Sequence, residues 1–229
     1  MRIGVPKEAA PNERRVAVTP DVAGKLVKSG FEVVVERGAG SGAFFLDDAY
    51  GASGAGLGDR RSVLGQSDIV VQVQAPSPES LAQYREGSAL IAAFQPSADL
   101  HRQLAQRKLT AFTLVLLPRI TRAQGMDVLS SQATVAGYKA VLLAASAAPR
   151  VFPMLVTAAG TLPAARVLVL GAGVAGLQAI ATARRLGAIV SAFDVRPAVK
   201  EQVQSLGAMF LEMKIEEHAE TAGGYAKEL

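Results

Sequence analysis

One stretch, VLVLGAGVAGLQAI at residues 167–180, constrains the fold more than any other feature. Four apolar residues run into a turn that contains Gly171, Gly173 and Gly176, and a helical pattern follows. In the unit that binds dinucleotides, the first glycine permits the tight turn, the second lets the backbone approach the pyrophosphate, and the third lets helix and strand close. The helix N-terminus attracts the anion. The spacing predicts such a turn; the alternative is a glycine-rich turn without a ligand.

The residues after the turn continue this unit. The helix is expected from about Ala175 to Leu186, with Gly187 as its C-terminal cap. The next apolar run, AIVSAF, predicts a second strand that ends at Asp194, 23 positions after Gly171. This is near the separation of about 20 at which an acidic residue accepts hydrogen bonds from the adenosine ribose.

Asp194 also bears on the choice between NAD and NADP. A 2′-phosphate beside a carboxylate is a like-charge contact that costs several kcal/mol, so Asp194 favours NAD. Arg196 acts in the opposite direction, because an arginine near this position can accommodate that phosphate. We predict NAD(H) as the cofactor.

The N-terminal half alternates strand and helix signals. A helical pattern through Val22, Leu26 and Val27 ends at Gly30, and the segment 38–56 is glycine-rich and indicates a loop with a short helix around Asp47 to Tyr50. Such alternation predicts a mostly parallel, doubly wound sheet. The expected strands are RIGVP (2–6), EVVVE (32–36), DIVVQVQAP (68–76), ALIAAF (89–94) and LTAFTLVLL (109–117).

A long helix is expected from Val128 to Pro149. Its apolar face is predicted to contain Leu129, Ala133, Ala136, Ala140 and Leu143. This places an N-terminal α/β domain at 1–127, a connecting helix at 128–150 and an NAD(H)-binding domain at 151–229, where TAAGTLPAA forms a loop before the strand at 167–170.

The fold class is therefore α/β, with two doubly wound parallel-sheet (Rossmann-like) domains. After Gly171 the chain has room for three strands, the third at AMFLEM. A full dinucleotide fold has a second half beyond the switch point. The second domain is thus expected to be truncated, incomplete at its C-terminal half, with an open strand edge.

Composition excludes several other classes. The chain has 229 residues, a net charge of +4 and 5% aromatic residues, with no basic run interleaved with aromatics, which argues against nucleic acid. It has no cysteine, and His101 and His218 are isolated, so we expect no metal site. The N-terminus lacks a secretory signal, and the uncharged run between Arg166 and Arg184 is short for a membrane span. Any link to a membrane should come through a partner.

Three longer stretches resemble one known family. They are RIGVPKE…NERRVAVTP, PRITRAQGMDVLSSQATVAGY and GAGVAGLQAIATARRLGAIVSAFDVRPAVKEQVQSLGA. With them the chain resembles the family that joins alanine dehydrogenase to the NAD(H)-binding component of proton-translocating NAD(P) transhydrogenase. The last two stretches are similar to the transhydrogenase branch, and the resemblance covers essentially the whole chain.

In that branch, as the resemblance implies, a chain like this binds NADH and a separate component binds NADP(H). A membrane-embedded component couples hydride transfer to proton movement. The resemblance further implies a homodimer that is cytoplasmic and peripheral, held at the cytoplasmic face of the inner membrane through its partner subunits. Composition already argues against nucleic acid and against direct membrane insertion.

The two branches differ in their substrate residues. Alanine dehydrogenases hold and deprotonate their substrate with an arginine, a lysine and a histidine; Arg15 matches the arginine, but Gln74 and Gln95 stand where the lysine and histidine would be. A neutral amide cannot be the general base for oxidation of an amine. This departure favours the transhydrogenase branch over an alanine dehydrogenase; a non-catalytic remnant that only binds nucleotide is the third hypothesis.

Hydride transfer between two nicotinamide rings needs no acid or base, only rings held at about 3 to 3.5 Å in a water-poor cleft. The resemblance implies which residues position them. Tyr225 could also be an ordinary surface aromatic, and Asp127 an ordinary helix N-cap. The implied catalytic residues are Arg119, Gln124, Asp127 and Ser130, the cofactor contacts are Gly171, Gly173, Val174, Gly176, Asp194, Val195 and Arg196, and the closing loop, in TAGGYAKEL, contributes Gly224 and Tyr225.

Overall fold

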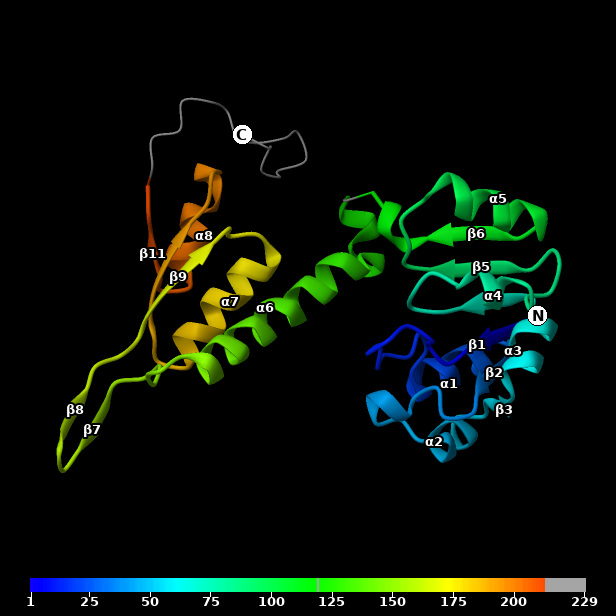
Figure 1. Cartoon of the computed structure of the whole chain (residues 1–229), viewed down its shortest axis with the longest axis horizontal. Coiled ribbons are helices and arrows are strands. Elements are labelled where there is room, and N and C mark those ends of the chain that lie inside the picture. The colour runs from blue at the N-terminus through cyan, green and yellow to red at the C-terminus, as the bar shows by residue number, and fades with distance from the viewer. Residues whose placement is uncertain (119, 213–229) are drawn as a thin grey trace. The chain divides into compact units, whose positions relative to one another are not determined.

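The computed structural model describes residues 1–118 and 120–212. The chain divides into two compact units, Met1–Met126 and Asp127–Leu229, which are described separately (Figure 1). The predicted connecting helix falls within the second of them.

The first unit is built around a parallel sheet. Its described residues form six strands in the order β3-β2-β1-β4-β5-β6, the order of a dinucleotide-binding sheet. Its elements are β1 (Arg2–Val5), α1 (Pro20–Lys28), β2 (Glu32–Glu36), η1 (Ser41–Ala43), α2 (Asp47–Ala52), β3 (Gly56–Gly58), α3 (Arg60–Gln66), β4 (Ile69–Val71), α4 (Pro78–Leu81), β5 (Ala89–Ala92), α5 (Ala98–Gln106), β6 (Thr110–Thr113), η2 (Leu114–Leu116) and η3 (Thr121–Met126).

The predicted strands of this unit are confirmed, because each expected apolar run contains one. β1 and β2 pair in parallel with Ile3 opposite Val33, and these β-branched side chains are buried. The helix between them begins at Pro20 behind an N-cap Thr19. Gly30 follows its end with φ +89°, a conformation that favours glycine.

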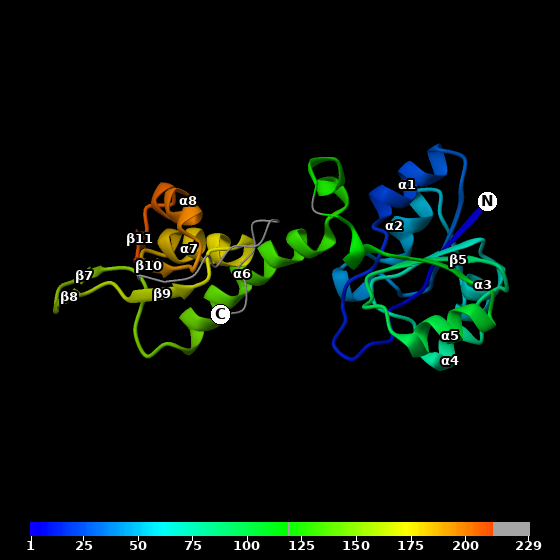
Figure 2. The same ribbon diagram turned by 90° about the horizontal axis from the view of Figure 1, so that it is seen from above.

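Helices cover both faces of this sheet. One core cluster contains Ala23 of α1 and Tyr50 of α2, and a second contains Leu64 of α3, Leu81 of α4 and Leu104 of α5. Figure 2 shows α1 and α2 on one side of the sheet and α4 and α5 on the other. This is the doubly wound arrangement that the sequence predicts.

The glycine-rich segment 38–56 differs in part from the expected loop. It contains the expected short helix, α2, but its last residue starts strand β3, Gly56–Gly58, at the edge of the sheet. The sequence GLG has no alternation and only one apolar side chain, so the usual strand signal is absent. The segment is held as a strand by its parallel pairing with β2.

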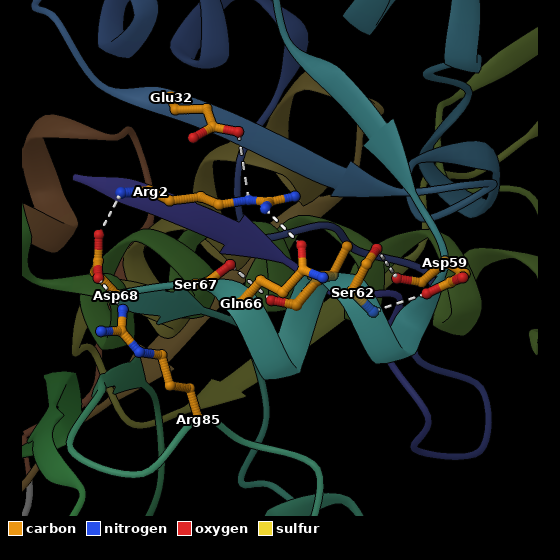
Figure 3. Close-up of polar contacts among 9 residues, drawn as sticks. Arg2, Glu32, Asp59, Ser62, Gln66, Ser67, Asp68 and Arg85 are labelled. Carbon is orange, nitrogen blue, oxygen red and sulfur yellow. Dashed lines mark hydrogen bonds and ion pairs between the residues drawn. The ribbon is translucent and has the colours of Figure 1, made fainter.

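The amino ends of the strands are tied together by polar contacts (Figure 3). The backbone N–H of Arg2 donates to Asp68 at 2.7 Å, and its guanidinium donates to Gln66 at 2.7 Å and pairs with Glu32 at 3.5 Å. Asp68 also pairs with Arg85. These contacts join the amino ends of β1, β2 and β4.

The second unit, over its described residues, contains a parallel sheet of three strands in the order β11-β10-β9. This is half of the order expected of a complete dinucleotide-binding sheet. On one face Leu168 and Leu170 of β9 are 56% and 75% exposed. The elements are α6 (Val128–Ala147), β7 (Leu155–Thr157), β8 (Gly160–Leu162), β9 (Arg166–Leu170), α7 (Val174–Arg185), β10 (Ile189–Phe193), η4 (Pro197–Val199), α8 (Lys200–Ser205) and β11 (Met209–Phe210).

Two expectations for this unit are wrong. The stretch TAAGTLPAA, expected as a loop, contains the turn and second strand of an antiparallel hairpin, β7–β8. The expected apolar face of α6 is largely exposed, with Leu143 at 58%. The helix instead buries Gly137 and Val141.

Small residues explain the packed face of α6. A Cβ at Gly137 would lie 2.1 Å from the carbonyl oxygen of Ala175 in α7, so the two helices approach closely where no side chain intervenes. By length and composition alone α6 could span a membrane, with a mean hydropathy of 1.2. A single helix of this kind is weak evidence of a membrane span; 11% of its apolar stretch is buried, and α6 packs along α7.

Candidate functional site

The turn between β9 and α7 is open to a ligand. Gly171 has φ +90°, which favours glycine, and its N–H donates to the carbonyl of Phe193 at 2.8 Å. Gly173 is the N-cap of α7 and supplies no side-chain cap. The first N–H groups of the helix are therefore left for another acceptor, as at an anion-binding helix N-terminus.

The three glycines have different surroundings. A Cβ at Gly176 would lie 1.8 Å from the carbonyl oxygen of Gly171, whereas a Cβ at Gly173 would meet no atom within 4 Å. Gly176 thus closes the helix onto the turn, and Gly173 faces open space. This geometry fits a pyrophosphate that approaches the backbone at Gly173.

Asp194, directly after β10, lies against the same turn. One oxygen, Oδ2, accepts from the N–H of Ala172 at 2.7 Å and from Nη2 of Arg196 at 2.9 Å. The other, Oδ1, accepts from the backbone N–H and from Nε of Arg196, both at 2.9 Å. The carboxylate is thus joined both to the glycine turn and to the arginine two residues later.

These contacts set the charge of Asp194. Burial raises the pKa of its carboxyl, but the hydrogen bonds from Arg196 and from the Ala172 N–H outweigh burial and lower the pKa to about 2. Its side chain is 5% exposed and that of Arg196 is 12% exposed. Asp194 is therefore a buried, ionised carboxylate at neutral pH.

The other predicted cofactor contacts are near this turn in the sequence. Val174 is the first residue of α7 and is 43% exposed. Val195 lies between the two members of the ion pair and is partly buried. Gly224 and Tyr225 lie outside the described residues.

The predicted nicotinamide-side residues are described only in part. Asp127 is the N-cap of α6: its Oδ1 accepts from the N–H of Ser130 at 3.0 Å, and its Oδ2 from the Ser130 hydroxyl at 2.7 Å. Gln124 lies in η3 of the first unit and is exposed. Arg119 lies outside the described residues. Asp127 and Ser130 are thus in contact as a helix cap, and their role at a nicotinamide stays a prediction.

The first unit has a crevice of its own at the switch point between β1 and β4, where ligands bind in many doubly wound sheets. A cavity of about 250 Å³ lies there, lined in part by Glu8, Arg60 and Gln74. Glu8 accepts from the N–H groups of Val73 and Gln74 at 2.6 and 3.2 Å. Burial raises the pKa of the Glu8 carboxyl.

Arg15, the residue that matches a substrate-binding arginine, is engaged by Glu13. Its Nε and Nη2 donate to the two oxygens of Glu13 at 2.8 and 2.6 Å. The side-chain amide of Gln74 donates to the same carboxylate at 2.7 Å. The hydrogen bond from Arg15 is the main cause that lowers the pKa of Glu13 to about 2. Gln95 is exposed after β5.

Glu13, which contacts both Arg15 and Gln74, is not predicted from the sequence. The sequence does contain a sign of this contact: an acidic residue is followed two positions later by an arginine in NERR, as it is in FDVR. Among the described residues, no group of three or more histidine, cysteine, aspartate or glutamate side chains is placed to hold a metal.

Comparison with protein families gives two matches that together span most of the chain. Residues 4–136 match the alanine dehydrogenase/PNT N-terminal domain. Residues 140–227 match the alanine dehydrogenase/PNT C-terminal domain.

Individual relatives point to one branch more strongly than the other. The chain is 52% identical, over its whole length and 62% of the relative's, to an NAD(P) transhydrogenase alpha subunit of Rhodospirillum rubrum. It is 31% identical to alanine dehydrogenase 2 of Staphylococcus aureus, over 90% of this chain and 56% of that protein. The solved transhydrogenase of Sinorhizobium meliloti superposes with a TM-score of 0.90 at 51% identity, over 93% of this chain and 64% of the solved one. The chain thus spans less than two thirds of the length of these relatives.

Proposed function

Because the chain belongs to the alanine dehydrogenase/pyridine nucleotide transhydrogenase family, we propose that it is the NAD(H)-binding component of a proton-translocating NAD(P) transhydrogenase. In this function hydride passes between NADH on this chain and NADP⁺ on a partner component. The observation that carries the proposal is the contrast between an open nucleotide turn at Gly173 and a substrate arginine, Arg15, that Glu13 already holds.

That contrast bears directly on the chemistry. Oxidation of an amine needs a base to take a proton, and Gln74 and Gln95 cannot do so. When NADH is bound, its C4 hydrogen leaves with both bonding electrons, so NADH becomes NAD⁺ and NADP⁺ becomes NADPH without exchange of a proton. The chain then has only to bind, orient and exclude water.

The chain's residues divide this work. Gly171, Gly173 and Gly176 form the turn that receives the pyrophosphate at the start of α7, with Val174 and Val195 beside it. Asp194 accepts from the adenosine ribose and favours NAD(H) over NADP(H). Arg119, Gln124, Asp127 and Ser130 position the nicotinamide, and Gly224 and Tyr225 close over the nucleotide.

The proposed partners are an NADP-binding component, a membrane-embedded component and a second copy of this chain. The exposed apolar side chains of α6 and of the β7–β8 hairpin, among them Val135 at 58%, Leu143 at 58% and Val156 at 76%, are a surface of the kind that homodimers bury. We place the protein in the cytoplasm, held peripherally at the inner membrane through these partners.

The experiment is a transfer assay. This chain, NADH and the NADP-binding component are mixed with an NADP analogue whose reduced form absorbs at its own wavelength. Transfer to the analogue that requires this chain supports the proposal. NADH binding without transfer supports the non-catalytic remnant instead.

The second candidate, an alanine dehydrogenase, rests on the relative that is 31% identical and on Arg15. Its assay is oxidation of NADH that depends on pyruvate and ammonia. Such activity in the wild-type chain would overturn the interpretation of Glu13, Gln74 and Gln95.

A further inference from the structure

The carboxylate of Asp194 has no acceptor position left for a ribose. A carboxylate offers about four lone-pair sites, and here four N–H donors fill them, two at each oxygen. Two of these donors, the N–H groups of Ala172 and Arg196, belong to the backbone and are fixed by the fold. The other two, Nε and Nη2, belong to the Arg196 side chain and can leave by rotation of that side chain.

The two Arg196 side-chain donors, Nε and Nη2, equal in number the two hydroxyl donors of an adenosine ribose. Nε bonds Oδ1 and Nη2 bonds Oδ2, both at 2.9 Å, so that a flat fork of two donors spans the carboxylate. An adenosine ribose presents two neighbouring hydroxyls, each of which can donate once. Departure of the Arg196 fork would expose one acceptor position on each oxygen, the number that the diol needs.

We propose, on the basis of the function proposed above, that Arg196 is a latch that sets nucleotide selectivity. Its guanidinium fork occupies Asp194 in the free chain and is exchanged for the ribose diol when NADH binds. NADH therefore has to displace the Arg196 side chain from the carboxylate of Asp194. With NADPH, a 2′-phosphate takes the place of one hydroxyl, and the displaced guanidinium is a cation that can pair with it. Arg196 thus weakens NADH binding and supports NADPH binding.

The proposal fixes the sign of both effects of one substitution. In Arg196→Ala the fork is absent, so NADH should bind about three- to tenfold more tightly. NADPH should bind about threefold or more weakly, since its phosphate loses the arginine. If Arg196 only supported the structure of the site, its removal would weaken the binding of both nucleotides. For NADH this is the opposite of the gain in affinity predicted here.

The test is a fluorescence titration of NADH and of NADPH against the full chain and three variants. Arg196→Lys keeps the charge but lacks the fork, so it should bind NADH more tightly than wild type while it retains most NADPH binding. It also carries the test if Arg196→Ala does not fold. Arg102→Ala removes the same charge from an exposed pair with Asp99 and should leave both affinities unchanged. Thermal unfolding of each variant reports whether it is folded.

The outcomes separate the latch from the function on which it rests. A gain in NADH affinity with a loss in NADPH affinity supports the latch. If wild type binds NADH and both Arg196 variants bind it equally or more weakly, the latch is wrong while the proposed function stands. If wild type and both Arg196 variants all fail to bind NADH, the proposed function fails and the latch fails with it.

Discussion

The two units each contain an acidic residue followed two positions later by an arginine, and the two pairs are held in the same way. In Glu13–Arg15 and in Asp194–Arg196, the arginine donates its backbone N–H and Nε to one carboxylate oxygen and Nη2 to the other. The fourth donor differs. It is the side chain of Gln74 in the first unit and the backbone N–H of Ala172 in the second.

The fourth donor determines which part of its unit each carboxylate contacts. Glu13 lies beside the neutral amide of Gln74 at the crevice of the first unit, and it neutralises the arginine that an alanine dehydrogenase would present to substrate. Asp194 is bonded to the glycine turn itself, so a group that binds its carboxylate lies next to the helix N-terminus. In the proposed function, the same local geometry therefore occupies Arg15 in the first unit and places Asp194 beside the turn proposed to bind the nucleotide in the second.

The largest expected effect is on the turn that carries the glycines of the second unit. Gly176→Ala places a methyl carbon against the Gly171 carbonyl, and it should lower the free energy of unfolding by about 3 kcal/mol and abolish NADH binding. Gly173→Ala is the matched control, because its Cβ meets open space. It should change the free energy of unfolding by less than about 0.5 kcal/mol, while its methyl group obstructs the pyrophosphate and weakens NADH binding. Chemical denaturation and NADH titration of both variants check this.

A Gly173→Ala chain that binds NADH as well as wild type would show that the pyrophosphate does not approach this backbone. A stable Gly176→Ala chain would show that helix and turn are less tightly packed than the geometry indicates.

The next effect concerns Asp194 itself. Asp194→Ala removes the acceptor for the ribose and should weaken NADH binding by about tenfold, the order expected when hydrogen bonds to a charged group are lost. NADPH binding should weaken less, because the like-charge contact with its phosphate is also removed. Titration of both nucleotides gives the ratio; a ratio equal to that of wild type would contradict the assignment of Asp194.

Acid should weaken both pairs alike. The pKa values of Glu13 and Asp194 are lowered to about 2, below their ordinary values of 4.5 and 3.8. Because the pKa of each carboxyl is lower in the folded state, its ionised form stabilises the fold at pH values above the ordinary pKa. This stability is lost as the pH falls from about 4.5 to about 2. At about 1.36 kcal/mol per pKa unit, the shift at Asp194 corresponds to about 2 kcal/mol at neutral pH. The larger shift at Glu13 is discounted to about 1 kcal/mol because the side chain of its partner Arg15 is 44% exposed and screened by solvent.

Denaturant unfolding at a series of pH values checks this, with Glu13→Gln and Asp194→Asn as the paired variants. Each substitution should flatten the fall in unfolding free energy between pH 4.5 and 2. Variants with the same slope as wild type would mean that these carboxyls titrate normally.

The smallest expected effect concerns Arg15, which Glu13 holds in the first unit. Arg15→Ala should cost about 1 kcal/mol of stability, as for a partly exposed ion pair, and should change the NADH dissociation constant by less than about twofold. Denaturation and NADH titration measure these effects. A large loss of NADH affinity would mean that Arg15 contributes to the nucleotide site after all.

How far the sequence predicted the structure depended on whether a local pattern or a distant contact decides each element. The β-branched runs of β1 and β2 and the glycine spacing after β9 are local, and both were predicted correctly. Strand β3 was missed, because GLG is held by its pairing with β2. The predicted packed face of α6 was wrong, because apolar and small residues are spread around that helix and the close approach of α7 at Gly137 decides which of them are buried.

The site shows the same division. The position of Asp194 follows from its distance to Gly171 along the chain, and the structure places its carboxylate on the turn. That Glu13 holds Arg15 depends on the side-chain rotamers of both residues, which spacing alone does not determine. The roles of Arg119, Gln124, Asp127, Ser130, Gly224 and Tyr225 stay predictions.

The measurement that tests the central claim most directly is a fluorescence titration of the wild-type chain with NADH, with NADPH as the comparison. The account predicts saturable binding that is tighter for NADH than for NADPH. Absence of saturable binding, or tighter binding of NADPH, would contradict the claim that the turn at Gly173 and the carboxylate of Asp194 form an NAD(H) site.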